Sequence, residues 1–591
     1  MANITLENDL INCFKLYGNI NEEIVEKCEK MCNLYNLTAE DLGNEWGAYS
    51  ACNLTSAVPT LAALEGMERK EFAKRSGEFS SKKQQFSQTP TSTKRLQSRL
   101  DECNSNSPSS NVYSTPKRSN VKRLRSPDIN TLPKEDLNVS SGVLSSPSLQ
   151  LENYDFSQRT NSGKIEVSYG IQTLLKNATF KRKVENSENC VEVKLVSNEE
   201  EEAISSDALH MFNVNNLKAS YLSSKIEWIG KYLLRKFSLG ETQTYVKTSG
   251  MVTIYGQICC DSSDKLDSTS TLLEGSQELT NGSTVELNFS KLSNYAIFPG
   301  QVVAVQGFNP HGNSFTVQKL YTDASVSTST HSIIPTFTEP VQIVVAVGPF
   351  TVSNNLSYTP LQELIKYVTN NIPHVLILIG PFVDASQENI SDITMMDIYD
   401  AFFETLIDCV MSPLEGLNIK VVLVPSAKDA HHHIVFPTPP YKVRKTYSNL
   451  QCIGDPSILN IEGITLGLTS TDVLLHLSKQ ESSYGNQGSD RISRLASHLL
   501  CQQSFYPIYP PNEDVCIDYE LLEQHGTISF IPNILILPSS LRYFVKYING
   551  CVVINPERVT KGYVGGTFCR IEVAPKTSTV SDNVVAQIIR I

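Results

Sequence analysis

Three short apolar runs in the second half of this 591-residue chain constrain its fold most strongly. They are Val341–Val347, His374–Ile379 and Ile419–Val424, and helical patterns separate them. Runs this apolar are typical of strands buried on both faces, and strands that alternate with helices form parallel sheets. Sites in such sheets open at the carboxyl ends of the strands. The sequence therefore predicts an α/β domain whose site would lie in the loops after these runs.

Two helices are predicted between the strands. The first has Thr359 as its N-cap and Pro360 at its first helical position, a common start signal. The second runs from about Asp392 to Met411, with apolar residues at helical spacing.

The loops after the three strands resemble the metal-binding motifs of calcineurin-like phosphoesterases in position but not in residue type. Two-metal hydrolysis needs several carboxylates and imidazoles to hold the cations around a water. Among the positions that match the motifs, only Asp384 offers a carboxylate, and Pro381 stands where the family has its metal-bridging Asp. The resemblance implies a phosphoesterase fold without metal or other cofactor; the alternative is a metal-dependent phosphodiesterase or nuclease. The predicted vestigial site comprises Gly348, Pro349, Gly380, Pro381, Asp384, Pro425 and Ser426.

Composition limits which other classes of protein the chain can belong to. No run reaches the ~20 apolar residues that span a bilayer, and no secretion signal is recognisable, so we expect a protein of the cell interior. Fourteen cysteines without a Cys-x-x-Cys pair are typical of reduced core thiols. A net charge of -12 argues against a surface that tracks a phosphate backbone as a whole. The run His431–His433 is predicted to stabilise its loop rather than bind a metal, because adjacent side chains point in different directions.

Residues 1–75 are predicted to form a small helical docking module. Leu10 and Phe14 share one apolar stripe, and a second stripe lies within Glu22–Leu34. An extension without a partner is the alternative.

Residues 76–205 are predicted to form a disordered, phosphorylatable linker, because Ser, Thr, Asn, Gln and Pro replace apolar residues there. The weakly patterned stretch from Ile165 to Glu202 is predicted to continue it. Five Ser/Thr-Pro pairs are candidate phosphorylation sites, with Thr115 favoured because Lys117 and Arg118 follow it: Thr89, Ser107, Thr115, Ser126 and Ser146. A basic cluster predicts nuclear import, or else a solubilising patch: Lys117, Arg118, Lys122, Arg123 and Arg125.

Residues 206–335 are predicted to form an OB-type barrel with a preceding amphipathic helix. The helix contains Leu217, Trp228 and Leu233. Four strands separated by Gly-containing turns suit a small, partly open Greek-key barrel: 251–258, 285–289, 301–306 and 314–320. OB barrels often stack bases on aromatic residues in a basic groove. Few aromatic residues and several nearby carboxylates favour protein packing here, with a single-stranded DNA-binding protein as the alternative.

An OB barrel followed by a phosphoesterase-type domain without ligands resembles the B subunits of eukaryotic replicative DNA polymerases, and the alpha branch in particular. The resemblance covers about residues 215–591, and the stretches that carry it are 256–261, 295–303, 467–472, 506–511, 541–546, 555–562 and 565–568. It implies a non-catalytic second subunit of the DNA polymerase alpha–primase complex in the nucleus, with an inactive phosphoesterase-like domain at 336–591. The implied partners are the C-terminal domain of the catalytic subunit, the primase subunits and, through the N-terminal module, other replisome factors. Contact with DNA would be indirect.

No short signature marks the interface with the catalytic subunit. Aromatic and Arg side chains dominate interface hot spots, so five residues are candidates: Tyr506, Tyr509, Arg542, Tyr543 and Phe544. Core packing is the alternative role for the aromatic ones.

Overall fold

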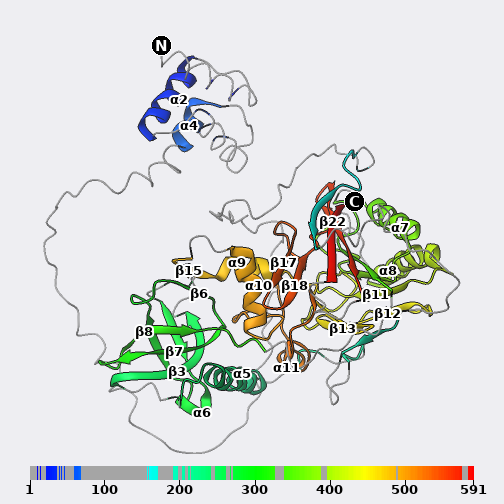
Figure 1. Ribbon diagram of the computed structural model, residues 1–591. Coiled ribbons are helices and arrows are strands. Elements are labelled where there is room, and N and C mark those ends of the chain that lie inside the picture. Colours follow the sequence, from blue (N-terminus) through cyan, green and yellow to red (C-terminus); the bar gives the residue numbers. More distant parts are fainter. Residues whose placement is uncertain are drawn as a thin grey trace, which may run out of the picture. The chain divides into compact units, whose positions relative to one another are not determined.

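The structure is a computed structural model that divides into two compact units, Met1–Lys134 and Glu135–Ile591 (Figure 1). In the first unit it describes residues 10, 14, 22–35, 39, 42, 46 and 59–67. In the second it describes residues 156, 159–170, 191–196, 203–206, 210–212, 215–240, 242, 247–260, 266–267, 270–326, 339–353, 355–387, 396–486, 490–575 and 583–591.

The first unit is built around helix α2, Glu22–Tyr35, which ends one residue beyond the predicted helix, and α4, Leu61–Met67. Leu10 and Phe14 are fully buried beside α2, as their stripe predicts. The core also contains Trp46, whose ring centroid lies 6.4 Å from that of Phe14. The described part of this unit therefore has a hydrophobic core of its own.

A closed five-stranded barrel forms the first part of the second unit, in the order β3-β4-β5-β8-β7. Its strands are β3 (Thr248–Cys260), β4 (Thr271–Glu274), β5 (Thr284–Asn288), β7 (Val302–Asn309) and β8 (Ser314–Tyr321), with the short helix α6 (Gln277–Thr280) after β4. The sequence predicted four of these strands and missed β4. The barrel interior is apolar, as alternation along β5 and β8 requires.

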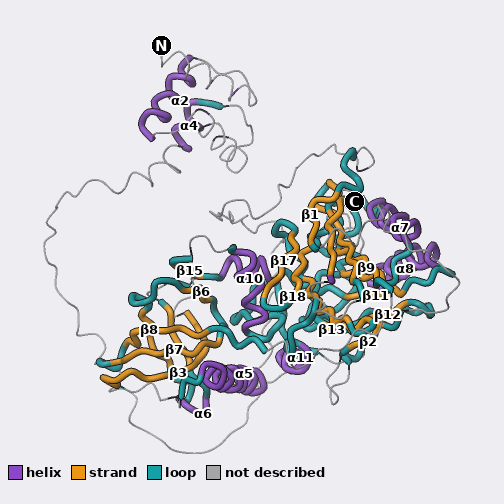
Figure 2. Tube along the Cα trace, viewed as in Figure 1, coloured by secondary structure: helices purple, strands orange, loops and turns teal. Residues whose placement is uncertain are grey.

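Helix α5, Asn215–Phe237, precedes the barrel and packs against its outer surface (Figure 2). Ile226, Ile229 and Leu233 are buried against β3 and β7. Leu217 and Trp228, which were expected on the packed face, are 49% and 38% exposed. They lie three helical turns apart on the side opposite the barrel, so the apolar stripe is narrower than predicted.

The rest of the unit contains two sheets. The seven-stranded sheet has the order β1 (Ile165–Tyr169), β22 (Val584–Arg590), β21 (Thr567–Val573), β9 (Val341–Val347), β10 (Val375–Ile379), β11 (Lys420–Val424) and β12 (Leu450–Cys452). The six-stranded sheet has the order β17 (Phe544–Ile548), β18 (Cys551–Asn555), β16 (Ile534–Ile536), β14 (Ile464–Leu468), β13 (Ser457–Ile461) and β2 (Val193–Leu195). The predicted parallel pairing of the three apolar runs is confirmed, because β10 lies parallel between β9 and β11.

Helices cover the outer face of each sheet. Residues of α7 (Thr359–Asn371) and α8 (Met396–Met411), followed by the 3-10 turn η5 (Ser412–Leu414), share a core with one face of the seven-stranded sheet. The other face of that sheet packs directly on the six-stranded sheet. Helices α9 (Val473–Gln480), α10 (Arg491–Cys501) and α11 (Tyr519–His525) form a further core with the other face of the six-stranded sheet. The order is therefore helix, sheet, sheet, helix (Figure 1).

The start of α7 differs from the prediction by one residue. Tyr358 is the N-cap, in the left-handed region at φ 52°, and Thr359 is already helical. Tyr358 makes no capping hydrogen bond through its side chain; instead its hydroxyl donates to the carbonyl of Phe382 at 2.7 Å. A tertiary contact thus replaces the local cap. Helix α8 is described from Met396, and the predicted start near Asp392 lies outside the described residues.

The linker prediction needs correction between residues 159 and 206. Strand β1 pairs antiparallel with β22, and β2 pairs antiparallel with β13. Ile204 is buried against Gly454, and Phe156 against Gly565. This stretch therefore adds an edge strand to each sheet, because a few alternating apolar residues are enough once a partner strand is present.

Several contacts join the barrel to the rest of the unit. Strand β6 (Tyr295–Ile297) pairs with β15 (Ser482–Tyr484), and the side-chain amide of Gln502 accepts from the Val302 N–H at 2.8 Å and donates to the Val302 carbonyl at 3.0 Å. At Gly300, with φ +93°, a Cβ atom would lie 2.2 Å from the Tyr509 nitrogen. The two parts therefore pack backbone against backbone. Across the described residues, no helix has the length and apolar character needed to cross a membrane.

Candidate functional site

The three predicted strand ends meet at one edge of the seven-stranded sheet. Val347, Ile379 and Val424 are in register across β9, β10 and β11, so the loops that follow start side by side. Gly348 lies so close to the second loop that a Cβ atom would be 2.0 Å from the carbonyl oxygen of Pro381. Backbone therefore fills the space between the first two loops.

Asp429, at the end of the third loop, holds the loops together. It is 1% exposed, and its Oδ1 accepts hydrogen bonds from the N–H groups of Phe382 at 2.6 Å and Val383 at 2.8 Å. Its Oδ2 accepts from the Tyr441 hydroxyl. Burial raises the pKa of the Asp429 carboxyl to about 7, although these donors favour the ionised form. Both carboxylate oxygens are therefore engaged by the chain's own donors.

Asp384, the carboxylate that the sequence analysis identified, makes its hydrogen bonds within its own loop. Its Oδ1 accepts from the Ser386 N–H at 2.9 Å and from the Ser386 hydroxyl at 2.7 Å, and its backbone forms an isolated bridge with that of Asp429. Ser426 is buried, and its hydroxyl accepts from the Lys428 N–H at 3.3 Å. Pro425, at the start of the third loop, is buried as well. Asp384 and Ser426 therefore accept hydrogen bonds within their own loops.

A buried arginine lies beside these loops. Arg558 is 8% exposed and donates from Nη1 to the Gly348 carbonyl at 3.2 Å. Burial lowers the pKa of the guanidinium, while the charges of Asp472 and Asp384 act in the opposite direction. Next to it, the Thr560 hydroxyl contacts the Pro349 carbonyl at 2.8 Å. The positive charge near Asp384 and Asp472 is thus supplied by an arginine of the chain itself.

The consecutive histidines pack beside Tyr441 and one another, but His431 and His432 have different principal contacts. The His431 ring lies between Phe403 and Tyr441, with centroids at 4.2 and 5.5 Å. His432 Nε2 lies 2.7 Å from the Pro439 carbonyl oxygen. Burial lowers the pKa of His431 to about 3 and that of His432 to about 4, so both are neutral at physiological pH. In the described ranges, no group of three or more His, Cys, Asp or Glu side chains is placed to hold a metal ion.

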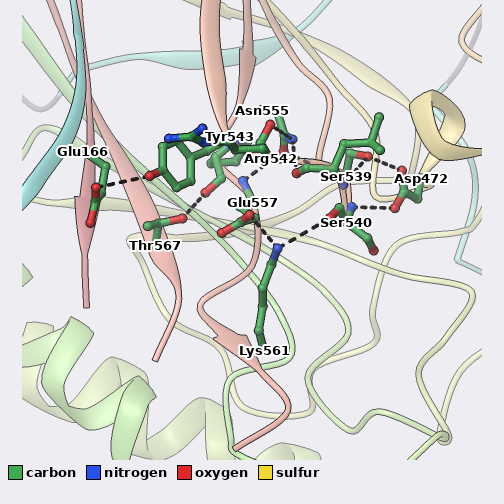
Figure 3. Close-up of polar contacts among 12 residues, drawn as sticks. Glu166, Asp472, Ser539, Ser540, Arg542, Tyr543, Asn555, Glu557, Lys561 and Thr567 are labelled. Atoms are coloured by element: carbon green, nitrogen blue, oxygen red, sulfur yellow. Dashed lines mark hydrogen bonds and ion pairs between the residues drawn. The ribbon is translucent and has the colours of Figure 1, made fainter. Parts of the chain in front are cut away.

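A second polar network supports the segment from Ser539 to Tyr543 (Figure 3). Asp472, the N-cap of α9, accepts from the Ser539 hydroxyl at 2.6 Å and from the Ser540 N–H at 2.7 Å. Asn555 is fully buried, accepts from the Ser539 N–H at 3.0 Å and donates to the Leu541 carbonyl at 2.9 Å. These bonds satisfy a turn that would otherwise bury unpaired backbone groups.

Charged side chains extend the network toward the surface. Lys561 Nζ lies 2.5 Å from Glu557 Oε1, and the Tyr543 hydroxyl donates to Glu166 Oε2 at 3.1 Å (Figure 3). Glu166 belongs to β1, so the stretch predicted as linker contributes directly to this region. The stretch from Asn555 to Gly562, which carries part of the family resemblance, therefore has a structural role. It supplies the buried amide of Asn555, the buried guanidinium of Arg558 and the ion pair between Glu557 and Lys561.

The five candidate interface residues differ in accessibility. Tyr506 and Phe544 are 1% and 4% exposed and belong to the core beneath α9 to α11, so the core alternative applies to them. Tyr509 and Tyr543 are half-buried, and Arg542 is exposed with its guanidinium 5.5 Å from the Tyr543 ring. Of the five predicted residues, Tyr509, Arg542 and Tyr543 therefore have surface available for contact with a partner protein.

The predicted phosphorylation sites and the basic cluster lie outside the described residues. Sequence reasoning missed the roles of Asp429, Arg558 and Tyr441. A signal existed for two of them, because Asp429 follows the third strand end directly and Arg558 lies inside a stretch that carried the family resemblance.

Comparison with known proteins matches each part of the chain to one family. The family model for the B subunits of DNA polymerases alpha and epsilon matches residues 343–546. The models for the OB domain and the N-terminal region of the DNA polymerase alpha B subunit match residues 219–323 and 9–74. The DNA polymerase alpha B subunit of Mus musculus is 34% identical over 495 residues, which is 81% of either chain. The chain belongs to the DNA polymerase alpha B subunit family.

Two further B subunits extend the similarity. That of Rattus norvegicus is 31% identical over 588 residues, covering 96% of this chain and 97% of the relative. That of Drosophila melanogaster is 42% identical over 313 residues, covering 52% and 50%. These matches confirm the resemblance found in the sequence, and the OB match coincides with the barrel and most of α5. Membership makes the chain a subunit of the DNA polymerase alpha complex.

Proposed function

We propose that this B subunit is a non-catalytic scaffold of the DNA polymerase alpha–primase complex. It would bind the C-terminal domain of the catalytic subunit and keep primase in the same assembly. Its N-terminal module would tether the complex to other replication factors for primer synthesis. The work of the subunit is then to hold surfaces in fixed relation, without chemistry of its own.

The observation that carries this proposal is the filled strand-end site. A binuclear hydrolase needs carboxylate oxygens free to bind cations. Here Asp429 accepts three hydrogen bonds from the chain, Asp384 caps Ser386, and Arg558 brings its own positive charge. The four-layer order of helices and sheets supports a phosphoesterase-like domain at 336–591 whose site has become part of the core.

Several features of the proposal come from the family and the sequence. The partners named above, a nuclear location and regulation by phosphorylation of the 76–205 segment fit a replication subunit. Phosphate on Thr115 would partly cancel the neighbouring Lys117 and Arg118, which weakens an import signal or a basic contact. DNA would be reached through the complex.

The decisive experiment is reconstitution with an activity control. The full chain, co-expressed with the catalytic and primase subunits, should elute as one complex with one copy of each. The purified chain, assayed with Mn²⁺ or Zn²⁺ on bis-p-nitrophenyl phosphate, should turn over no faster than its Asp384→Asn variant. Turnover that disappears in Asp384→Asn would make it a phosphodiesterase. A chain that elutes alone would remove the scaffold role.

A binding assay addresses single-stranded DNA. Affinity of the purified chain for oligo(dT) should be weak and change little between low and physiological salt. A steep salt dependence would reveal several phosphate contacts and favour the DNA-binding alternative.

A further inference from the structure

A groove with a volume of about 750 Å³ lies beside the contact between α5 and the barrel, along the N-terminal half of the helix. One wall is the N-terminal half of α5; the other is formed by β3, β4 and α6, which lie beside α5 in Figure 1. Tyr509, from the loop before α11, closes one side. Leu222 and Ile226 give the groove an apolar stretch, so it can accommodate the aliphatic part of a long side chain.

Two acceptors in the groove have no partner among the described residues. Gln257 and Glu274 face each other across β3 and β4, so their side chains lie on the same side of the sheet. Gln257 is 1% exposed, and its Oε1 receives no hydrogen bond. Burial raises the pKa of Glu274, and within the described part of the chain this carboxylate has neither a hydrogen bond nor an ion pair. A buried oxygen without a donor, such as Gln257 Oε1, is uncommon in folded proteins; with the half-buried Glu274 carboxylate opposite it, this points to a donor supplied from outside.

The charge pattern restricts what that donor can be. Glu278 also lines the groove, so two carboxylates repel phosphate groups and disfavour a nucleic acid. Lys218, at the far side, lies over the rings of Tyr509 and Tyr519 at 5.2 and 5.1 Å, where it can meet a backbone carbonyl. A matching ligand therefore has a side chain with several N–H donors at the end of an apolar stem. It also has a peptide backbone whose carbonyl group can meet Lys218.

We propose that this groove binds a segment of a partner protein that inserts an arginine side chain between Glu274 and Gln257. The guanidinium has five N–H donors in a planar fork, enough to reach the carboxylate and the amide oxygen together. Its methylene groups pack on Leu222 and Ile226. This inference rests on the proposed scaffold function, because the segment belongs to another subunit of the complex.

Three full-length variants test the groove. Glu274→Lys reverses the charge that the arginine meets, and Ala219→Trp fills the groove from an exposed position on α5 without touching the core. Glu286→Lys is the matched control, because Glu286 is an exposed β5 residue of the same barrel outside the groove. Unfolding midpoints of all three should stay within a few degrees of wild type, which separates binding from folding.

Binding is measured by interferometry with the reconstituted catalytic subunit and primase as the probe. Glu274→Lys and Ala219→Trp should weaken binding at least tenfold, and Glu286→Lys less than twofold. If wild type does not bind the probe, the proposed function fails. If wild type binds but the two groove variants bind as Glu286→Lys does, the scaffold function stands and the groove inference is wrong.

Photo-crosslinking identifies the occupant. A benzoylphenylalanine at Ser220, on the groove wall, should capture one segment of a partner subunit that contains an arginine. Replacing that arginine by methionine should reproduce the loss seen with Glu274→Lys, and the two changes together should cost no more than either alone. A captured segment without arginine would overturn the inference.

Discussion

The strand-end loops and the barrel groove both contain buried acceptor oxygens, but the two regions satisfy them differently. Asp429 receives hydrogen bonds from Phe382, Val383 and Tyr441, all from the same chain. Across the described residues, Gln257 Oε1 in the groove receives none, and neither does the Glu274 carboxylate. The Asp429 carboxylate is satisfied within the chain, whereas the acceptors in the groove are short of donors.

We relate this difference to the proposed roles of the two regions: a site without ligands at the strand ends and a binding surface in the groove. Buried polar groups destabilise a fold unless they are paired. Where pairing is internal, as around Asp429, it holds loops in place and leaves nothing for a ligand to bind. Where it is missing, as at Gln257 Oε1, we propose that a partner bringing donors gains affinity. The comparison predicts that changes in the first region lower stability, whereas changes in the second affect binding and leave stability almost unchanged.

Among single substitutions compared at pH 7, the largest loss of stability is expected for Arg558→Met. This change removes a buried cation facing Asp384 and Asp472 together with its hydrogen bond to the Gly348 carbonyl. An unbalanced buried charge costs several kcal/mol, and we expect a loss of about 3 kcal/mol in the free energy of unfolding. Urea denaturation of the full chain measures it. The exposed Arg542→Met is the control and should change stability by less than about 0.5 kcal/mol. Equal losses in both variants would show that the strand-end site is not held by its internal charge.

Gly348→Ala is expected to follow. A Cβ atom at this position would lie 2.0 Å from the Pro381 carbonyl oxygen, so one loop must move. Overpacking of this kind costs about 1–3 kcal/mol. The matched control is Gly250→Ala in β3, where the nearest atom to a Cβ is the Thr248 hydroxyl at 3.9 Å. Thermal unfolding should show a lower midpoint for Gly348→Ala alone; unchanged midpoints in both would mean that the two loops are not in contact.

The sequence predicted what depends on apolar patterning and missed what depends on tertiary partners. The runs at β9, β10 and β11 are almost entirely apolar, so their pairing could be foreseen. Strands β1 and β2 are only five and three residues long, too short to signal a strand on their own, and they pair with the edges at β22 and β13. Likewise, Tyr358 replaces the predicted cap because its hydroxyl reaches Phe382 across the fold.

The candidate site shows the same division. The absence of ligand side chains at Gly348, Pro349 and Pro381 is visible in the residues themselves. That Asp429 joins the second loop to Tyr441 is not visible, because the second loop lies 47 residues from Asp429 and no local pattern links Tyr441 to it. The groove was missed for a related reason: Gln257 is an ordinary strand residue until β4, which was not predicted, places Glu274 opposite it.

The third prediction concerns the pH dependence of the first region. The pKa of Asp429 is raised from 3.8 to about 7, so the folded chain binds this proton more tightly than the unfolded chain. Stability from this group is therefore highest below pH 4, falls as pH rises toward 7 and is flat above. The slope is at most about 1.4 kcal/mol per pH unit for one proton. Asp429→Asn keeps the acceptor for Phe382 and Val383 but does not titrate. Subtracting its unfolding free energy from that of wild type across pH 4–8 should isolate the decline; parallel curves would place the Asp429 pKa at its ordinary value.

The smallest effect is expected in the groove, where Glu274→Gln should raise stability slightly. The pKa of this carboxyl is raised by burial, so the ionised form disfavours the folded state at pH 7, and a neutral amide removes that cost. At a partly exposed site without a counter-charge, the gain should be below about 0.5 kcal/mol, and it should vanish below pH 4, where the wild-type group is protonated. The same variant should bind the reconstituted catalytic subunit and primase more weakly, because an amide pairs poorly with a guanidinium. Stability and binding would then change in opposite directions at one residue, as expected when an acceptor is left for a partner. A loss of stability instead would mean that Glu274 already has a donor within its own chain.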